Sequence, residues 1–362
     1  MSHTTKKYTV VGCMSGTSLD GLDLCLLNFS YISPEEIQYQ MVKTFCVEYD
    51  EHWLQKLKHA HQLSAEELIE LHHAYGQYIG EQINGFLSNH SGKVDFVSSH
   101  GHTVFHNPQQ HISLQIGHGA YIANTCKLPV VCDFRTGDIA LQGQGAPLVP
   151  IGDQLLFGDY DACLNLGGFA NISFQQNRQS IAFDICPVNI VLNALMQPLG
   201  KAYDHNGSTA AGGNVHPKLL AELNQLEYYH QTPPKSLGRE WVAEHISPIL
   251  AVDLPTKDIL ATFTLHAAQQ ITSVINANQI KSILITGGGA HNKHLITLLQ
   301  QNSNAQIITA DPQLIDYKEA LIFALLGLLR ILGLPNTLPS VTGATKPLSS
   351  GAIYLPTDYT QL

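Results

Sequence analysis

Short apolar runs separated by turn-forming residues mark the first part of the chain. Tyr8 to Met14 is typical of a buried strand, and Leu22 to Phe29 is typical of a strand that returns after a glycine-containing turn. Ile37 to Val47 can add a third strand. The pattern therefore predicts an antiparallel hairpin with one further strand beside it.

Helix signals and two more apolar runs follow. Ser64, with Glu67 three positions later, has the signature of a capping box and predicts a long amphipathic helix that ends near Asn89. The runs 94–99 and 128–132 are bounded by glycine, proline and polar residues, so they predict central strands of a first sheet. The glycine- and proline-rich stretch 137–150 is the predicted connection between two lobes.

The same pattern of strands then begins again. Residues 162–166, 170–174 and 180–183 predict three strands, of which the third ends at Asp184. The remaining predicted elements are a helix over 256–278, a strand over 282–286, a helix from near Asn292 and a last helix over 317–332. The tail 341–355 has strand character and can return to the first lobe.

The length of 362 residues exceeds what one hydrophobic core usually organises. Two glycine-turned hairpins, each opening a series of alternating strands and helices, indicate a duplicated α/β architecture. We expect an N-terminal lobe of residues 1–134 with 336–362, and a C-terminal lobe of residues 135–335. A cleft between two lobes is the expected place for a site.

Composition narrows the range of functions. Apolar residues make up 44% of the chain and charged residues 13%, a balance typical of a well-buried globular enzyme. The net charge of −10, without a cluster of Lys and Arg, argues against a nucleic-acid partner. The polar start lacks the apolar stretch of a secretory signal, and the apolar run 320–329 ends at Arg330, so we expect no membrane span. Seven cysteines without a paired spacing fit a reducing cytoplasm.

The first turn carries groups suited to phosphate. Residues 12–23 read GCMSGTSLDGLD and combine glycines with hydroxyl and carboxylate side chains. Backbone N–H groups exposed at glycines form an anion-binding concavity, and a carboxylate such as Asp20 can hold hydrated magnesium. An ordinary tight hairpin is the alternative, because Gly, Ser and Asp are the usual turn residues. The pattern GxxxxGK[ST] does not occur in the chain, which excludes the common P-loop.

Two more glycine turns, Gly167–Gly168 and Gly287–Gly289, favour a nucleotide held between lobes, as in actin, sugar kinases and heat-shock chaperones. The resemblance then becomes specific. An ordered series of seven motifs is similar to that of the anhydro-N-acetylmuramic acid kinases and spans essentially the whole chain: GCMSGTSLDGLD, SSHGHTVFHNP, CDFRTGDIALQGQGAPLVP, LNLGGFANIS, FDICPVN, KSLGRE and ITGGGAHN.

The resemblance implies a two-lobed, actin-like (ribonuclease H-like) kinase with a duplicated mixed sheet flanked by helices. It implies ATP and Mg²⁺, water-driven opening of the 1,6-anhydro ring of an amino sugar, and phosphorylation of the released O6. It also suggests a cytoplasmic homodimer. The residues expected to bind the nucleotide are Gly16, Thr17, Ser18, Asp20, Gly21, Asp23, Gly167, Gly168, Gly287, Gly288 and Gly289, with Asp20 as the metal ligand.

Asp184 is the candidate base that accepts the proton of the attacking water. We expect its carboxylate at a strand terminus, because Pro187 stops the strand from continuing. The alternative is an N-cap of a helix near Val188. The chain departs here from the family pattern, which usually has glycines on both sides of this proline and an Asp a few positions later. It has Cys186, Val188 and Asn193 instead, which adds bulk near the proposed base.

The remaining candidates concern the sugar. Arg135 can clamp a lactyl carboxylate or a phosphate through its planar fork, with a surface ion pair as the alternative. Glu319 is expected in the first turn of the last helix, where the helix dipole alone would also explain it. By resemblance, the residues expected to line the sugar site are Ser15, His100, Thr103, Arg135, Asn189 and Glu319. Asn189 keeps the family residue, whereas Gln142 stands where a glycine is usual.

Two other functions stay open at this point. His100 and His102, with His106 close behind, can share one face of an extended segment and would suit a metal-dependent hydrolase on the same fold. Zinc or iron bound in stoichiometric amount would favour that enzyme. A nucleotide-gated chaperone or a relic binding module is the non-enzymatic alternative, although the appended substrate-binding domain of the heat-shock chaperones is missing.

Overall fold

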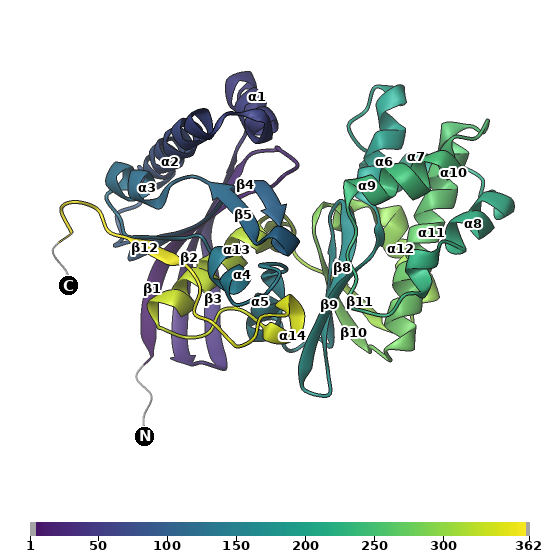
Figure 1. Ribbon diagram of the computed structural model, residues 1–362. Coiled ribbons are helices and arrows are strands. Elements are labelled where there is room, and N and C mark those ends of the chain that lie inside the picture. The colour runs from purple at the N-terminus through teal and green to yellow at the C-terminus, as the bar shows by residue number, and fades with distance from the viewer. Residues whose placement is uncertain (1–4, 360–362) are drawn as a thin grey trace. The chain divides into compact units, whose positions relative to one another are not determined.

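The computed structural model describes residues 5–359, and the chain divides into two compact units (Figure 1). The first unit contains the residues up to Leu156 and those from Tyr317 onward, and the second unit is Phe157–Asp316. The expected boundaries were 134/135 and 335/336, so residues 135–156 and 317–335 belong to the first unit instead of the second. Contacts of the helices in these two stretches explain the difference.

A mixed sheet forms the centre of the first unit. Its strands are β1 (Lys6–Ser15), β2 (Leu22–Ser33), β3 (Glu36–Val47), β4 (Phe96–Asn107), β5 (Ile112–Ile116), β6 (Val130–Cys132) and β12 (Ala352–Tyr354). The order is β12-β6-β4-β1-β2-β3, with β5 beside β4. Strands β1, β2 and β3 are antiparallel neighbours, whereas β4 and β6 run parallel to β1. The antiparallel pairing of β12 with β6 confirms that the tail returns to this unit.

Alternation along β1 places its two faces against different helices. Val11 and Cys13 lie in the core that includes Tyr75 of α2 (Ala65–Leu87). The predicted capping box is present at the start of α2. The Ser64 side chain accepts from the backbone N–H of Glu67, and the Glu67 carboxylate accepts from the backbone N–H of Ser64.

On the other face, Gly12 meets α13 (Pro312–Ile331). A Cβ on Gly12 would lie 2.2 Å from the carbonyl oxygen of Ala320, so only glycine allows this approach. The Ser98 hydroxyl also donates to the carbonyl oxygen of Phe323 at 2.5 Å. These contacts hold most of α13 in the first unit, although the helix begins before the boundary.

The predicted connection between lobes over 137–150 is wrong. Most of this stretch folds as α4 (Thr136–Ala140) and the turn that follows it, and the first unit extends to Leu156. Asp138 explains this, because its buried carboxylate accepts from the backbone N–H of Gly145 at 2.8 Å and from the Thr342 hydroxyl at 2.8 Å. The other helices of the unit are α1 (Glu51–His59), α3 (Gly119–Cys126), α5 (Val149–Leu156) and α14 (Pro339–Thr342).

The second unit repeats the strand plan of the first. Its strands are β7 (Ala162–Leu166), β8 (Phe169–Gln176), β9 (Gln179–Pro187), β10 (Ser282–Thr286) and β11 (Gln306–Thr309), in the order β11-β10-β7-β8-β9. Strands β7, β8 and β9 are antiparallel neighbours, and β10 and β11 run parallel to β7. This matches the order β6-β4-β1-β2-β3 of the first unit. The duplicated, ribonuclease H-like α/β fold is therefore confirmed.

Helices flank the second sheet, with α11 at the centre of the core. Phe263, Ala267 and Ile271 of α11 are fully buried. The helices of this unit, shown in teal and green in Figure 1, are α6 (Asn189–Met196), α7 (Ser208–Ala211), α8 (Pro217–Asn224), α9 (Arg239–Trp241), α10 (Ser247–Leu250), α11 (Thr256–Ala277) and α12 (Lys293–Asn302). Across residues 5–359, none of the helices is both long and apolar enough to cross a membrane.

Candidate active site

The first glycine turn joins β1 to β2 and presents polar groups to solvent. Thr17, Ser18 and Asp20 are exposed, and the backbone N–H of Leu19 donates to Gly16 O at 3.3 Å. A Cβ on Gly21 would lie 2.6 Å from both the Cys46 sulfur and the carbonyl oxygen of Val47, so the turn requires glycine at that position. Asp23, half-buried, follows in β2. The turn has the groups expected for phosphate and magnesium.

The two glycine turns of the second unit lie against each other. Gly287 has φ 79°, and a Cβ there would lie 2.5 Å from Oδ1 of Asn165. A Cβ on Gly289 would lie 2.7 Å from the Leu166 side chain. Asn189 joins the two turns, since its side-chain N–H group donates to Leu166 O at 3.2 Å. The structure therefore brings together residues that are more than a hundred positions apart in sequence.

This paired turn leaves backbone accessible. No atom lies within 4 Å of a Cβ built on Gly288, and Gly168 would meet only the Cβ of Ile190, at 3.7 Å. The backbone N–H of Asn189 donates to Gly167 O at 3.3 Å as α6 begins. Open glycine backbone beside the start of a helix suits the close approach of a phosphate. We refer to Gly167, Gly168, Gly287, Gly288 and Gly289 as the glycine cradle.

Asp184 lies within β9, and the expectation that the strand ends at this residue is wrong. The strand continues to Pro187, because β8 and β9 keep pairing beyond a bulge. One carboxylate oxygen, Oδ2, accepts from the backbone N–H of Leu237 at 2.9 Å. Burial raises the pKa of the Asp184 carboxyl, and this hydrogen bond lowers it. The N-cap alternative is also wrong, since Val188 caps α6 without a side-chain hydrogen bond.

The segment 235–240 (KSLGRE) holds Asp184 in place. The backbone N–H of Asp184 donates to Lys235 O at 3.3 Å, and the Tyr228 hydroxyl donates to the carbonyl oxygen of Asp184 at 2.6 Å. The ammonium of Lys235 in turn donates to Tyr228 O at 3.0 Å. Sequence reasoning used this segment for the resemblance but gave no residue in it a role. No periodicity connects it with a strand some fifty residues earlier.

The half-buried Arg135 contacts the buried His100 in the first unit. Nε and one terminal nitrogen of Arg135 lie 3.1 and 2.9 Å from Nε2 of His100. Burial lowers the pKa of His100 well below its usual value, and the charge of Arg135 lowers it further. Burial also lowers the pKa of Arg135 to about 10, although Glu319 opposes this effect. Arg135 therefore contacts His100 and does not form a surface ion pair, so that alternative prediction is wrong.

Glu319 lies on α13, which begins at Pro312, so the expectation that it opens the helix is wrong. The helix dipole acts only near the ends, and it does not explain a carboxylate two turns inside. Desolvation raises the pKa of the Glu319 carboxyl, and the charges of Arg135 and Lys318 lower it. Thr103, half-buried on β4, accepts a hydrogen bond from the Gln115 side chain at 3.4 Å.

The departures from the family pattern near Pro187 are absorbed by packing. Cys186 and Val188 are fully buried and belong to the hydrophobic core of the second unit. Their added bulk therefore fills the core and does not extend to solvent beside Asp184, whereas Asn193 is half-buried on α6. Gln142 has φ 67°, a left-handed conformation that explains why glycine suits its position.

The histidines considered for a metal site have other partners. His100 uses Nε2 for Arg135 and Nδ1 for Gly101 O at 3.0 Å. His102 contacts Ser15, and His106 contacts the hydroxyl of Ser113 at 3.1 Å. Within the described part of the chain, no three His, Cys, Asp or Glu side chains are grouped as metal ligands.

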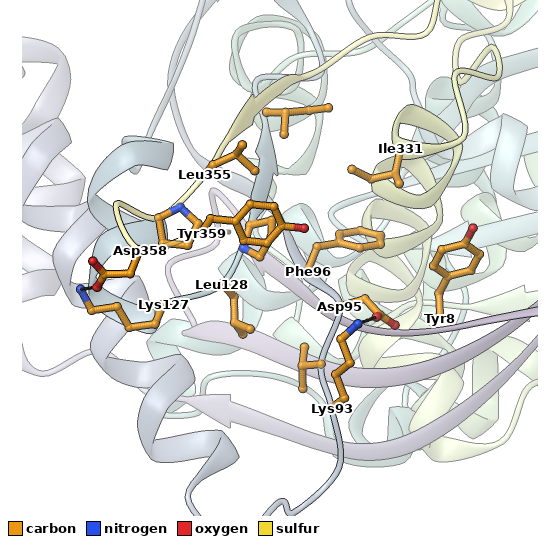
Figure 2. A pocket seen from close by; sticks show the side chains of 14 residues that line it. Tyr8, Lys93, Asp95, Phe96, Lys127, Leu128, Ile331, Leu355, Asp358 and Tyr359 are labelled. Carbon is orange, nitrogen blue, oxygen red and sulfur yellow. Dashed lines mark ion pairs between the residues drawn. The ribbon is translucent and has the colours of Figure 1, made fainter. Parts of the chain in front are cut away.

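A separate pocket of about 620 Å³ lies on the first unit (Figure 2). It is lined by the amino ends of the parallel strands, among them Asp95 just before β4 and Leu128 just before β6. Its charged groups are paired with each other, Lys93 with Asp95 at 3.2 Å and Lys127 with Asp358 at 3.9 Å (Figure 2). Ligands of such sheets bind at the carboxyl ends of the strands, so this pocket is not the candidate active site.

Chains of known structure match this chain at low identity and with TM-scores below 0.5. Component A of the (R)-2-hydroxyglutaryl-CoA dehydratase of Acidaminococcus fermentans matches with a TM-score of 0.44 and 13% identity, over 88% of this chain and 96% of that one. A glucokinase of the ROK family from Streptomyces griseus matches with a TM-score of 0.40 and 13% identity, over 89% and 99%. Similarity at this level carries no inference about activity.

The sequence itself has much closer relatives. The profile of the family described as anhydro-N-acetylmuramic acid kinase matches residues 8–356. The anhydro-N-acetylmuramic acid kinase of Pasteurella multocida is 36% identical, over 98% of both chains. That of Hydrogenovibrio crunogenus is 34% identical, over 96% of this chain and 98% of the relative. Because the match covers nearly the whole chain, this protein belongs to the anhydro-N-acetylmuramic acid kinase family.

Proposed function

We propose that this protein uses ATP to phosphorylate 1,6-anhydro-N-acetylmuramic acid, opening the anhydro ring with water and giving N-acetylmuramic acid 6-phosphate for cell-wall recycling. The full-length match to relatives that carry this name is the observation on which the proposal rests. The geometry of each unit supports it with groups suited to the reaction.

Asp184 is the proposed base. A water molecule forms a bond to the anomeric carbon, the bond between that carbon and O6 breaks, and the proton of the water passes to the Asp184 carboxylate. O6 keeps the electron pair of the broken bond and forms a bond to the γ-phosphorus of ATP, while the bond from that phosphorus to the β–γ bridging oxygen breaks and ADP leaves. A carboxyl with a raised pKa is a better proton acceptor than an ordinary aspartate, and the N–H of Leu237 holds it in one orientation.

The glycine cradle of the second unit is proposed to bind the phosphates of the nucleotide. Its backbone is open at Gly168 and Gly288, whereas a Cβ at Gly287 or Gly289 would collide with Leu166. In the first unit, the first turn is proposed to contact the nucleotide as well, with Asp20 as the ligand of Mg²⁺ and Asp23 as a further nucleotide-binding residue. When bound, the metal nucleotide supplies the phosphoryl group and offsets its negative charge. The protein residues bind it and keep its phosphates in position.

In the first unit, Arg135, His100 and Glu319 are proposed to contact the sugar. Arg135 has five N–H donors, of which three point at His100 and Gly145. The remaining donors suit the lactyl carboxylate of the substrate. Thr103 is proposed to line the same site.

The product mass tests this proposal. The purified protein, magnesium ATP and anhydromuramic acid are mixed, and the products are examined by mass spectrometry. We expect a species heavier than the substrate by one phosphoryl group (HPO3) and one water. A product heavier by water alone would show a hydrolase, and no product would contradict the proposal. Measurement of bound zinc and iron distinguishes the kinase from a metal-dependent hydrolase. Free hexoses, added as competitors, test the substrate class.

A further inference from the structure

A chain of buried hydroxyl groups lies directly beneath the first glycine turn. The Tyr75 hydroxyl on α2 is 2.5 Å from the Tyr49 hydroxyl, which is 2.7 Å from the hydroxyl of Ser15. Ser15 is in turn 3.0 Å from Nδ1 of His102. Ser15 is 1% exposed and His102 is 4% exposed, so the chain is shielded from bulk water. None of these contacts is explained by the roles proposed so far.

The hydroxyl groups form one cluster around Ser15. Tyr75 is fully buried, and its hydroxyl interacts with those of both Tyr49 and Ser15. The tyrosine hydroxyls therefore have their hydrogen-bond partners inside this cluster. The Ser15 hydroxyl in turn holds Nδ1 of His102, so Nε2 is the ring nitrogen left for another partner.

The other side of the ring is available to a ligand. Burial lowers the pKa of His102 to about 4, so the ring is neutral at physiological pH. Its Nε2 has no partner among residues 5–359 and is not enclosed by protein. A polar ring nitrogen on a side chain this buried is left unsatisfied unless a ligand or water meets it.

Local backbone geometry fixes where the ring points. His102, in the middle of β4, pairs with Ser15 across a bulge at the carboxyl end of β1, next to the glycine turn. Gly101 has φ 74°, and a Cβ there would lie 2.4 Å from the carbonyl oxygen of Ile116. The bulge and this glycine give His100 and His102 different partners, Arg135 and Ser15, although they are only two residues apart.

We propose that Nε2 of His102 forms a hydrogen bond with an uncharged polar group of the sugar substrate, and that Ser15 positions the ring for this contact. The inference rests on the proposed function. A neutral imidazole suits a hydroxyl or carbonyl oxygen, whereas phosphate oxygens are bound best by cations. Its place on β4 between His100 and Thr103 favours the sugar over the nucleotide. Ser15 was expected to contact the substrate itself, but in this proposal it acts only by holding the His102 ring.

Kinetics of three variants test the contact, after the wild type has been shown to convert anhydromuramic acid. His102→Phe keeps the ring area but removes the hydrogen-bonding nitrogen, so we expect KM for the sugar to rise about tenfold, with KM for ATP unchanged. His102→Gln keeps a donor and should recover most of the loss. Ser15→Ala should give a smaller rise, because the ring loses its orientation. His59→Phe, at an exposed histidine of α1, is the matched control.

Two outcomes would overturn the proposal. The first is that the His102→Phe variant unfolds at the wild-type temperature and has an unchanged KM for the sugar. The second is that only its KM for ATP rises. If that variant fails to fold, Ser15→Ala decides in the same way. Long-range ¹H–¹⁵N spectra of the wild type, assigned with His102→Gln, test the ring independently of turnover. We expect a neutral ring in a single tautomer at pH 7, because Ser15 holds Nδ1, and a charged ring or a mixture of tautomers would contradict the contact with Ser15. A wild type without turnover would instead contradict the proposed function.

Discussion

Two N–H groups of Arg135 point at a single ring nitrogen of His100, at 3.1 and 2.9 Å. A third N–H of Arg135 donates to Gly145 O at 2.7 Å. Because Nε2 of His100 accepts, its ring proton lies on Nδ1, where it donates to the carbonyl oxygen of Gly101. The guanidinium is thus held in one orientation by two structural partners, which leaves its outer donors for a ligand.

Arg135→Lys tests this arrangement. Lysine keeps the charge but cannot donate in a planar fork to His100 and Gly145 at once, so we expect kcat/KM for the sugar to fall roughly 10- to 100-fold. Steady-state kinetics measure the effect. Arg330→Lys is the matched control, because Arg330 donates to Gly351 O at 2.7 Å in the same unit and has no proposed ligand. A loss of the same size in both variants would contradict a specific role for Arg135.

The hydrogen bond from Leu237 to Asp184 predicts a change in pH dependence. Asp184 must be deprotonated to act as a base, so activity is lost as pH falls through its pKa, which burial has raised. Leu237→Pro removes the N–H that lowers this pKa. We therefore expect the acid limb of kcat/KM to move to higher pH. Leu237→Ala keeps the N–H and should leave the limb in place, and a shift in both variants would contradict the assignment.

Close packing at Gly12 makes a stability prediction. A methyl group there would overlap the carbonyl oxygen of Ala320, so Gly12→Ala should push α13 from the sheet and lower the free energy of unfolding by about 2 kcal/mol or more. Gly85→Ala is the matched control. No atom lies within 4 Å of a Cβ at Gly85, inside α2, so this change should stabilise the helix by about 0.5–1 kcal/mol. Urea unfolding measures both, and equal effects would contradict the packing.

The buried His102 and His266 and the half-buried His72 predict a loss of stability in mild acid. Burial lowers the pKa of His72 and His102 to about 4 and that of His266 to about 3. Between pH 6.5 and 4 the unfolded chain therefore binds protons that the folded chain does not. The free energy of unfolding should fall as pH is lowered, by about 1.4 kcal/mol per pH unit for each histidine.

Urea titrations at pH 7, 6 and 5 measure this dependence. His72→Asn should reduce the slope of the free energy of unfolding against pH by the contribution of one proton. Asparagine can still accept from the backbone N–H of Gly117, but it does not titrate. A slope that is the same in the variant and the wild type would show that His72 titrates normally in the folded protein.

The sequence predicted most of the fold because its strands and long helices carry strong local signals. The two hairpins, the capped helix from Ser64 and the return of the tail to β6 are all present. The boundary between the units was misplaced, since it depends on contacts such as that of Ser98 with Phe323, which are 225 positions apart. Local periodicity contains no information about such contacts.

The candidate site was predicted as a set of residue types, but not as an arrangement. The meeting of Gly287 with Asn165, and of Leu237 with Asp184, depends on how the β-strands pair. His102 was considered only as a metal ligand. Its hydrogen bond to Ser15 could not be foreseen, because that contact needs the bulge between β1 and β4.

The most direct test of the account is the turnover of anhydromuramic acid by Asp184→Asn. The asparagine oxygen can still accept from Leu237, so the fold should be kept, but it cannot take a proton from water, and we expect kcat to fall by about 10³-fold or more. Asp161→Asn is the control, because this exposed carboxylate accepts from the backbone of Lys281 at 2.8 Å and has no proposed part in the reaction. Turnover of Asp184→Asn at the wild-type rate would contradict the account.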